Sequence, residues 1–145
     1  GVRLVGSEMC IRDRDRAAYF CLMDFPVLND LSIYHKKIDL IKATAAQIQK
    51  DFALFDQEIT FSGDFDSAYV ELDHQIIRIV DRFLEINSSN FFALLYAIDI
   101  DENELKSVLF GEEFENPAAE ISRMIIEREL KKVIIRNHFK TLSRN

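Results

Sequence analysis

The sequence predicts an all-α protein, a helical bundle of three long helices and two short ones. Along two long stretches the apolar residues recur at alternating steps of three and four, which is the spacing of a helix with one buried seam. After the first 22 residues, glycine and proline occur only where these stretches break, at Pro26, Gly63, Gly111 and Pro117. A chain of 145 residues with 48% hydrophobic residues is long enough to form one domain with a core.

The first 22 residues are not expected to belong to the helical domain. Residues 1–14, GVRLVGSEMCIRDR, closely resemble translated sequencing-adapter read-through. Residues 15–22 look like translated sequence upstream of a start codon, and Met23 is the candidate initiator. We therefore expect residues 1–22 to be a disordered, non-native leader and residues 23–145 to form a single helical-bundle domain.

The same region contains both cysteines and the one apolar run that could be mistaken for a signal peptide. Cys10 and Cys21 lie in the leader, so no disulfide or zinc site is predicted. Asp24 and Pro26 interrupt the apolar run, which argues against a signal peptide. We expect a cytoplasmic protein, with no membrane segment.

The first long helix is expected from about Leu31 to Phe55 and the second from about Phe65 to Ile86. Because their seams match and the connection is short, the two helices predict an antiparallel hairpin. The seam residues are Leu31, Tyr34, Ile38, Ile41, Ala45, Ile48, Phe52 and Phe55 in the first helix and Phe65, Tyr69, Leu72, Ile76, Ile79, Phe83 and Ile86 in the second.

A short helix follows, capped by Ser88 or Ser89 and running through Tyr96. It has too many apolar residues for a short surface helix, so we expect it to fill the core between the longer helices. These residues are Phe91, Phe92, Leu94, Leu95 and Ile98.

The remaining helices have explicit start signals. Asp101 with Glu104 three residues later forms an acidic capping box for the second short helix, which Gly111 ends. Asn116 caps the last long helix and Pro117 occupies its first position; this helix is expected to reach about residue 140.

Two patterns on the second long helix invite a chemical interpretation. Glu71 and His74 have the spacing that supplies two ligands of a di-iron site, but the second Glu-x-x-His pair that such a site needs is missing. An exposed His74 with Arg78 one turn on also suggests a phosphorelay module, which would carry a glycine after the histidine that is absent here. We interpret His74 as a surface residue.

Asp99, Asp101 and Asn103 resemble the start of a calcium loop. The glycine and glutamate that the loop requires at its sixth and twelfth positions are replaced by Glu104 and Phe110. Helix capping explains Asp101 without a metal.

Two elements have features of nucleic-acid-binding proteins. The two short helices have the apolar spacing of a helix-turn-helix, but the helix that would read DNA is acidic. Residues 51–120 contain 17 acidic and 3 basic residues, whereas residues 121–145 contain 2 acidic and 7 basic residues. The basic final helix is interpreted as docking against acidic neighbours, and RNA or an acidic partner is the alternative.

Five stretches of the chain carry a family resemblance: Leu94 to Ile100, Glu104-Leu105, Ile125 to Arg128, Leu130 and Lys132. In these stretches the chain resembles a group of short uncharacterised bacterial helical proteins. The resemblance covers residues 30–140 and implies the helical fold but no activity.

No catalytic, cofactor-binding or metal-binding residue is predicted. The net charge of −7 disfavours nucleic acid as a partner, and clustered glycines for a phosphate loop are missing. We expect a small protein that acts through protein–protein contacts, with an unknown partner or as a homodimer. A nucleic-acid-binding or phosphorelay-type signalling module is the alternative.

Overall fold

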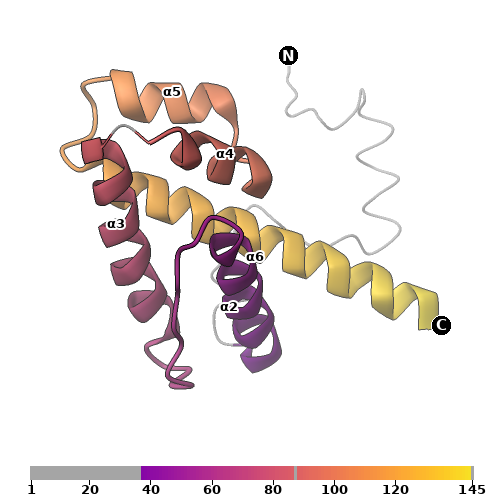
Figure 1. Ribbon diagram of the computed structural model, residues 1–145. Coiled ribbons are helices and arrows are strands. Elements are labelled where there is room, and N and C mark those ends of the chain that lie inside the picture. The colour runs from indigo at the N-terminus through magenta and orange to yellow at the C-terminus, as the bar shows by residue number, and fades with distance from the viewer. Residues whose placement is uncertain (1–36, 87, 145) are drawn as a thin grey trace, which may run out of the picture. The chain divides into compact units, whose positions relative to one another are not determined.

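The computed structural model describes residues 37–86 and 88–144, and all regular secondary structure in these residues is helical (Figure 1). The helices are α2 (Ile38–Ala53), α3 (Ala68–Ile86), α4 (Ser89–Ile98), α5 (Glu102–Phe110) and α6 (Pro117–Arg144). The all-α class, with three long helices and two short ones, is confirmed. The predictions made for the leader, for Met23 and for the start of the first helix before residue 37 lie outside the described residues. The described helices as far as Ile134 belong to one compact unit.

Three of the predicted helix caps form as expected. The Ser88 side chain accepts a hydrogen bond from the backbone N–H of Asn90 at 3.2 Å, and α4 begins there. Asp101 accepts from the N–H of Glu104 at 2.8 Å, and α5 begins there. Asn116 accepts from the N–H of Ala119 at 3.2 Å, one residue before Pro117 opens α6. Each cap satisfies a backbone donor that the helix itself leaves unpaired.

The connection between α2 and α3, residues 54–67, contains an extended segment at residues 57–62, which we call the strap (Figure 1). The side-chain amide of Gln75 accepts a hydrogen bond from the N–H of Thr60 at 2.9 Å and donates one to its carbonyl at 2.7 Å. The Glu71 carboxylate accepts from both the N–H and the hydroxyl of Ser62 at 2.9 Å. Side chains of α3 thus supply the strap with backbone partners that a neighbouring strand would otherwise provide.

The direction of the strap determines how α2 and α3 are paired. The strap runs antiparallel to α3, because Gln57 receives a hydrogen bond from Arg82 while Ser62 contacts Glu71. The Lys42 ammonium, near the start of α2, lies 5.6 Å from the centre of the Phe65 ring, just before α3 begins. The two helices therefore run in the same general direction, as Figure 1 also shows. The antiparallel hairpin predicted from the sequence is wrong, because the chain returns along α3 before that helix starts.

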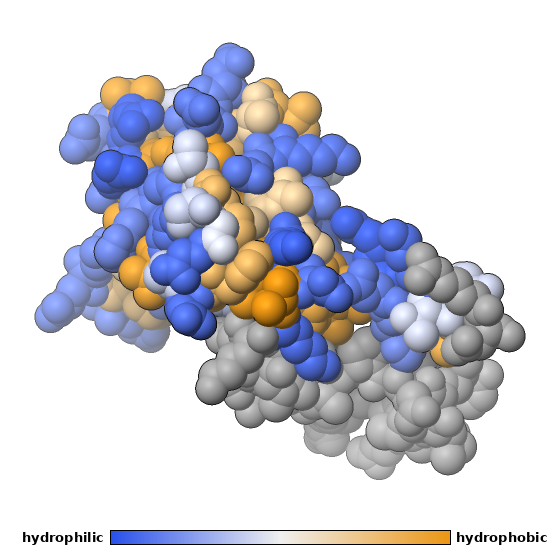
Figure 2. All heavy atoms as spheres, turned by 90° about the horizontal axis from the view of Figure 1, so that it is seen from below, coloured by the Kyte–Doolittle hydropathy of each residue, from blue (hydrophilic) through white to orange (hydrophobic). Residues whose placement is uncertain are grey.

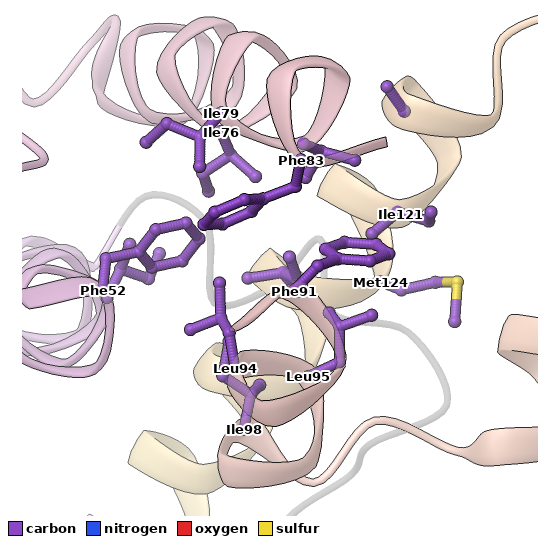
Figure 3. Close-up of a cluster of buried hydrophobic side chains, with 14 of the residues drawn as sticks. Phe52, Ile76, Ile79, Phe83, Phe91, Leu94, Leu95, Ile98, Ile121 and Met124 are labelled. Carbon is purple, nitrogen blue, oxygen red and sulfur yellow. The ribbon is translucent and has the colours of Figure 1, made fainter. Parts of the chain in front are cut away.

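The core is built by residues from the helices and the strap. Phe52 from α2, Phe83 from α3 and Phe91 from α4 meet with Ile121 and Met124 from α6 (Figure 3). Phe83 and Phe91 pack with ring centroids 6.0 Å apart. Burial of such aromatic and aliphatic side chains supplies most of the stabilisation of a helical domain. The prediction that the α4 segment fills the core is confirmed for four of its five residues, Phe91, Leu94, Leu95 and Ile98, and is wrong for Phe92, which is 49% exposed.

Candidate functional site

The side chains of Glu71 and His74 do not form a common site in the structure. Both carboxylate oxygens of Glu71 are engaged by Ser62, as described above, whereas His74 lies on the exposed side of α3. Among the described residues, no group of three or more His, Cys, Asp and Glu side chains is arranged to hold a metal ion. The role of Glu71 is to hold the strap.

Arg78 lines an open cavity of about 360 Å³ between α3 and the start of the strap. The same cavity is lined by Arg82 and by two acidic residues, Asp56 and Glu58. Arg82 donates a hydrogen bond to the Gln57 side chain at 3.2 Å. Mixed charges of this kind balance one another, so the cavity does not form the single-sign patch that a phosphoryl group or nucleic acid requires.

Asp99 and Asp101 are both used in building the corner between α4 and α5. Asp99 ends α4 in the left-handed conformation, with φ 72°, and its carboxylate binds Arg128 of α6 at 2.7 Å. Asp101 caps α5 through its hydrogen bond to Glu104. An open cavity of about 340 Å³ adjoins this corner, and residues of both signs line it, including Glu127 and Lys131. The corner is a capped and ion-paired connection between two helices.

Basic residues of the final helix pair with acidic neighbours, as one of the two sequence interpretations expected. Arg123 lies within 4 Å of the carboxylates of Glu104, Glu120 and Glu127. Arg128 pairs with Asp99, and Lys132 pairs with two carboxylates described next. These cations are thereby less available to phosphate groups than their number in the sequence suggests.

The most unusual polar contact of the molecule is a buried acidic pair with one lysine, which we call the acid cluster. It joins Gln47 and Asp51 of α2 to Glu129 and Lys132 of α6. Gln47 donates to Asp51 Oδ1 at 3.0 Å, and Lys132 Nζ lies 3.7 Å from Asp51 Oδ2. Lys132 Nζ also contacts Glu129 Oε1. The Glu129 side chain is fully buried and Asp51 is 8% exposed.

Burial changes the protonation of this cluster. The pKa of Glu129 is raised from 4.5 to about 8, mainly by burial and next by a hydrogen bond with the neighbouring Asp51 carboxylate, while Lys132 opposes both effects. A second carboxylate nearby favours the neutral form of a buried carboxyl group, because ionisation of both would place two negative charges side by side. At neutral pH Glu129 therefore retains its proton.

The acid cluster is internal. Asp51, Glu129 and Lys132 line neither of the two cavities described above. Sequence reasoning missed it because it followed apolar residues only. The available signal was a charged residue at a buried helical position, since Glu129 lies one turn after Ile125.

A different feature distinguishes the outer side of α4. No residue of this helix is charged, and its exposed residues alternate between aromatic and small side chains. Phe92 is 49% exposed and Tyr96 is 87% exposed. We call this surface the α4 outer face; it consists of Ser89, Asn90, Phe92, Ala93, Tyr96 and Ala97.

Other parts of the surface differ from the α4 outer face. On the side shown in Figure 2, hydrophilic residues predominate and apolar residues reach the surface in small patches between them. Other exposed apolar residues have charged neighbours. Leu54 lies close to charged residues in sequence, and Ile38 and Val70 line an open cavity together with Asp64 and Asp66. Single exposed apolar residues are ordinary on a protein surface, whereas an entire uncharged helix face is not.

In the part of the chain that the structure describes, no helix combines the length and apolar character needed to cross a membrane. Comparison with protein families, with curated proteins and with solved structures found no match. The functional interpretation therefore depends on the geometry of this chain alone.

Proposed function

We propose that this protein acts by binding another protein through the α4 outer face. The observation that supports this proposal is the exposure of Phe92 and Tyr96 on a helix that has no charged residue. Aromatic side chains give a large contact area at a low cost in conformational entropy, and they are enriched at the centres of protein interfaces.

The packing beneath the helix suits this role. The inner side of α4 contributes Phe91, Leu94, Leu95 and Ile98 to the core, and each of these is at most 2% exposed. The helix begins at the Ser88 cap and ends at Asp99, which is tied to α6 by its ion pair. Because the helix is fixed on its inner side and at both ends, little ordering is needed when a partner binds.

The alternatives receive less support from the same geometry. A phosphorelay function would depend on His74 and Arg78, and the cavity beside Arg78 is lined by Asp56 and Glu58. A nucleic-acid-binding function would depend on the basic final helix, where Arg123 is surrounded by carboxylates. Neither the cavity beside Arg78 nor the surface around Arg123 is uniformly basic.

The proposal keeps the expectation, made from the sequence, of a cytoplasmic protein of bacterial type. Expression of a tagged chain in bacteria, followed by fractionation, tests the location. Recovery of the tagged chain with the periplasmic fraction would contradict it.

Site-specific photo-cross-linking tests the contact itself. A photoreactive phenylalanine analogue is placed at Tyr96, and in a matched control at Lys106, an exposed position on α5. We expect a discrete covalent adduct at position 96 that position 106 does not give. Equal labelling at both positions, or none at position 96, would refute binding through this face.

A further inference from the structure

We propose that the partner bound by the α4 outer face is a second copy of this chain, in a weak two-fold dimer whose α4 helices pack antiparallel. This inference depends on the proposed function, because it assigns the partner of the same face. Charge, shape and area each contribute to it.

Charge limits where two copies of this chain can meet. The chain has a net charge of −7, and residues 51–120 contain 17 acidic residues against 3 basic ones. In a two-fold contact each patch faces its own copy, so an acidic patch would face an acidic patch. Repulsion between like charges would destabilise a dimer formed through an acidic patch. The α4 outer face has no charged residue, so a dimer formed through it avoids this repulsion.

The arrangement of residues on the face suits its own copy. Ala93 and Ala97 lie one helical turn apart on one side of the face, with Phe92 and Tyr96 one turn apart on the other. Small residues allow two helix backbones to approach closely. In an antiparallel contact centred on this turn, Phe92 of each copy meets Tyr96 of the other, and Ala93 meets Ala97.

The area predicts the strength of the contact. With about 200 Å² for a whole aromatic side chain, the exposed parts of Phe92 and Tyr96 amount to about 270 Å² in each copy. Two copies thus bury about 540 Å² through these rings alone, and interfaces below about 1,200 Å² in total are weak and transient. The dimer should therefore be concentration-dependent, with a dissociation constant in the micromolar range or above.

Sedimentation equilibrium over a wide concentration range provides the first test. We expect reversible dimerisation by the wild-type chain and at least a tenfold weaker association by Tyr96→Lys. Val70→Lys is the matched control, because Val70 is an exposed apolar residue on α3. Circular dichroism confirms that each variant is helical. A wild-type chain that stays monomeric at millimolar concentration, or a dimer that Tyr96→Lys leaves intact, would overturn the proposal.

Cysteine cross-linking tests the antiparallel order. In a chain with Cys10→Ser and Cys21→Ser, one preparation receives Ala93→Cys and a second, with a mass tag, receives Ala97→Cys. We expect the mixed disulfide to form faster than either symmetric one, and Ser107→Cys on α5 to give only slow background oxidation. Faster symmetric disulfides at position 93 would refute the antiparallel order.

The photo-cross-linking experiment separates failure of this inference from failure of the proposed function. If the chain is monomeric and position 96 forms an adduct with a different protein, the second copy is refuted and the binding face is retained. If position 96 forms no adduct, both are refuted.

Discussion

The acid cluster and the strap are two polar connections between segments of this protein, and they differ in their access to water. In the strap, carboxylate and amide groups of α3 bind an extended segment at the surface. In the acid cluster, similar groups join α2 to α6 in the interior, and burial there raises the pKa of Glu129 to about 8. The same functional groups thus act as ordinary hydrogen-bond partners in one region and as a proton-binding site in the other.

The largest expected effect is the pH dependence of the acid cluster. The pKa of Glu129 is raised in the folded state, so its contribution is fully present below its unfolded pKa of 4.5 and is lost as pH rises through about 8. The free energy of unfolding should fall between pH 5 and pH 9 by an amount on the order of 4 kcal/mol from this group. Urea unfolding at several pH values measures it. Glu129→Gln should flatten the profile, and an unchanged slope in this variant would contradict the assignment.

Removal of the lysine in the cluster should have the next largest effect. Lys132→Met leaves Asp51 and Glu129 without a cation, which should cost about 3 kcal/mol at pH 9, where Glu129 has lost its proton. At pH 6 the cost should be smaller, since Glu129 retains its proton. The adjacent Lys131→Met, which changes a residue outside the cluster, serves as the control in the same denaturation series. Equal losses at both pH values would show that the ion pairs do not account for the effect.

Substitutions in the contacts of the strap should lower the free energy of unfolding less, and by an amount that does not depend on pH. Gln75→Ala removes three hydrogen bonds with Thr60 and should cost about 1 kcal/mol, because water can replace a partner at the surface. The neighbouring His74→Ala, on the exposed side of α3, should leave the midpoint of urea unfolding unchanged. If Gln75→Ala were as damaging as Lys132→Met, the contrast between the two regions would be lost.

The helix pattern explains how much of this structure the sequence could predict. Ile48, Phe52, Leu72 and Ile76 lie in the core as their spacing required, and the caps at Ser88 and Asp101 could be identified from residue type alone. The direction of the strap could not be predicted. It depends on hydrogen bonds that Glu71 and Gln75 accept and that Arg82 donates, whose partners lie 9 to 25 positions earlier in the sequence.

The candidate site, like the fold, could be predicted from the sequence only in part. Spacing identified the apolar residues of α4, but it could not separate Phe91, which is buried, from Phe92, which is half exposed. That distinction depends on how the helix lies against α3 and α6. Glu129 was missed for a related reason, because its burial results from packing between segments far apart in the sequence.

The common direction of α2 and α3 has an electrostatic consequence. Parallel helices bring the positive ends of their macrodipoles to the same end of the molecule, where an antiparallel pair would have cancelled them. Acidic residues are placed at this end, with Asp39 in the first turn of α2 and Asp64 and Asp66 just before α3. Their negative charge offsets the two dipoles. Without these carboxylates both dipoles would be uncompensated, and the amino ends of the two helices should be the first part of the unit to fray.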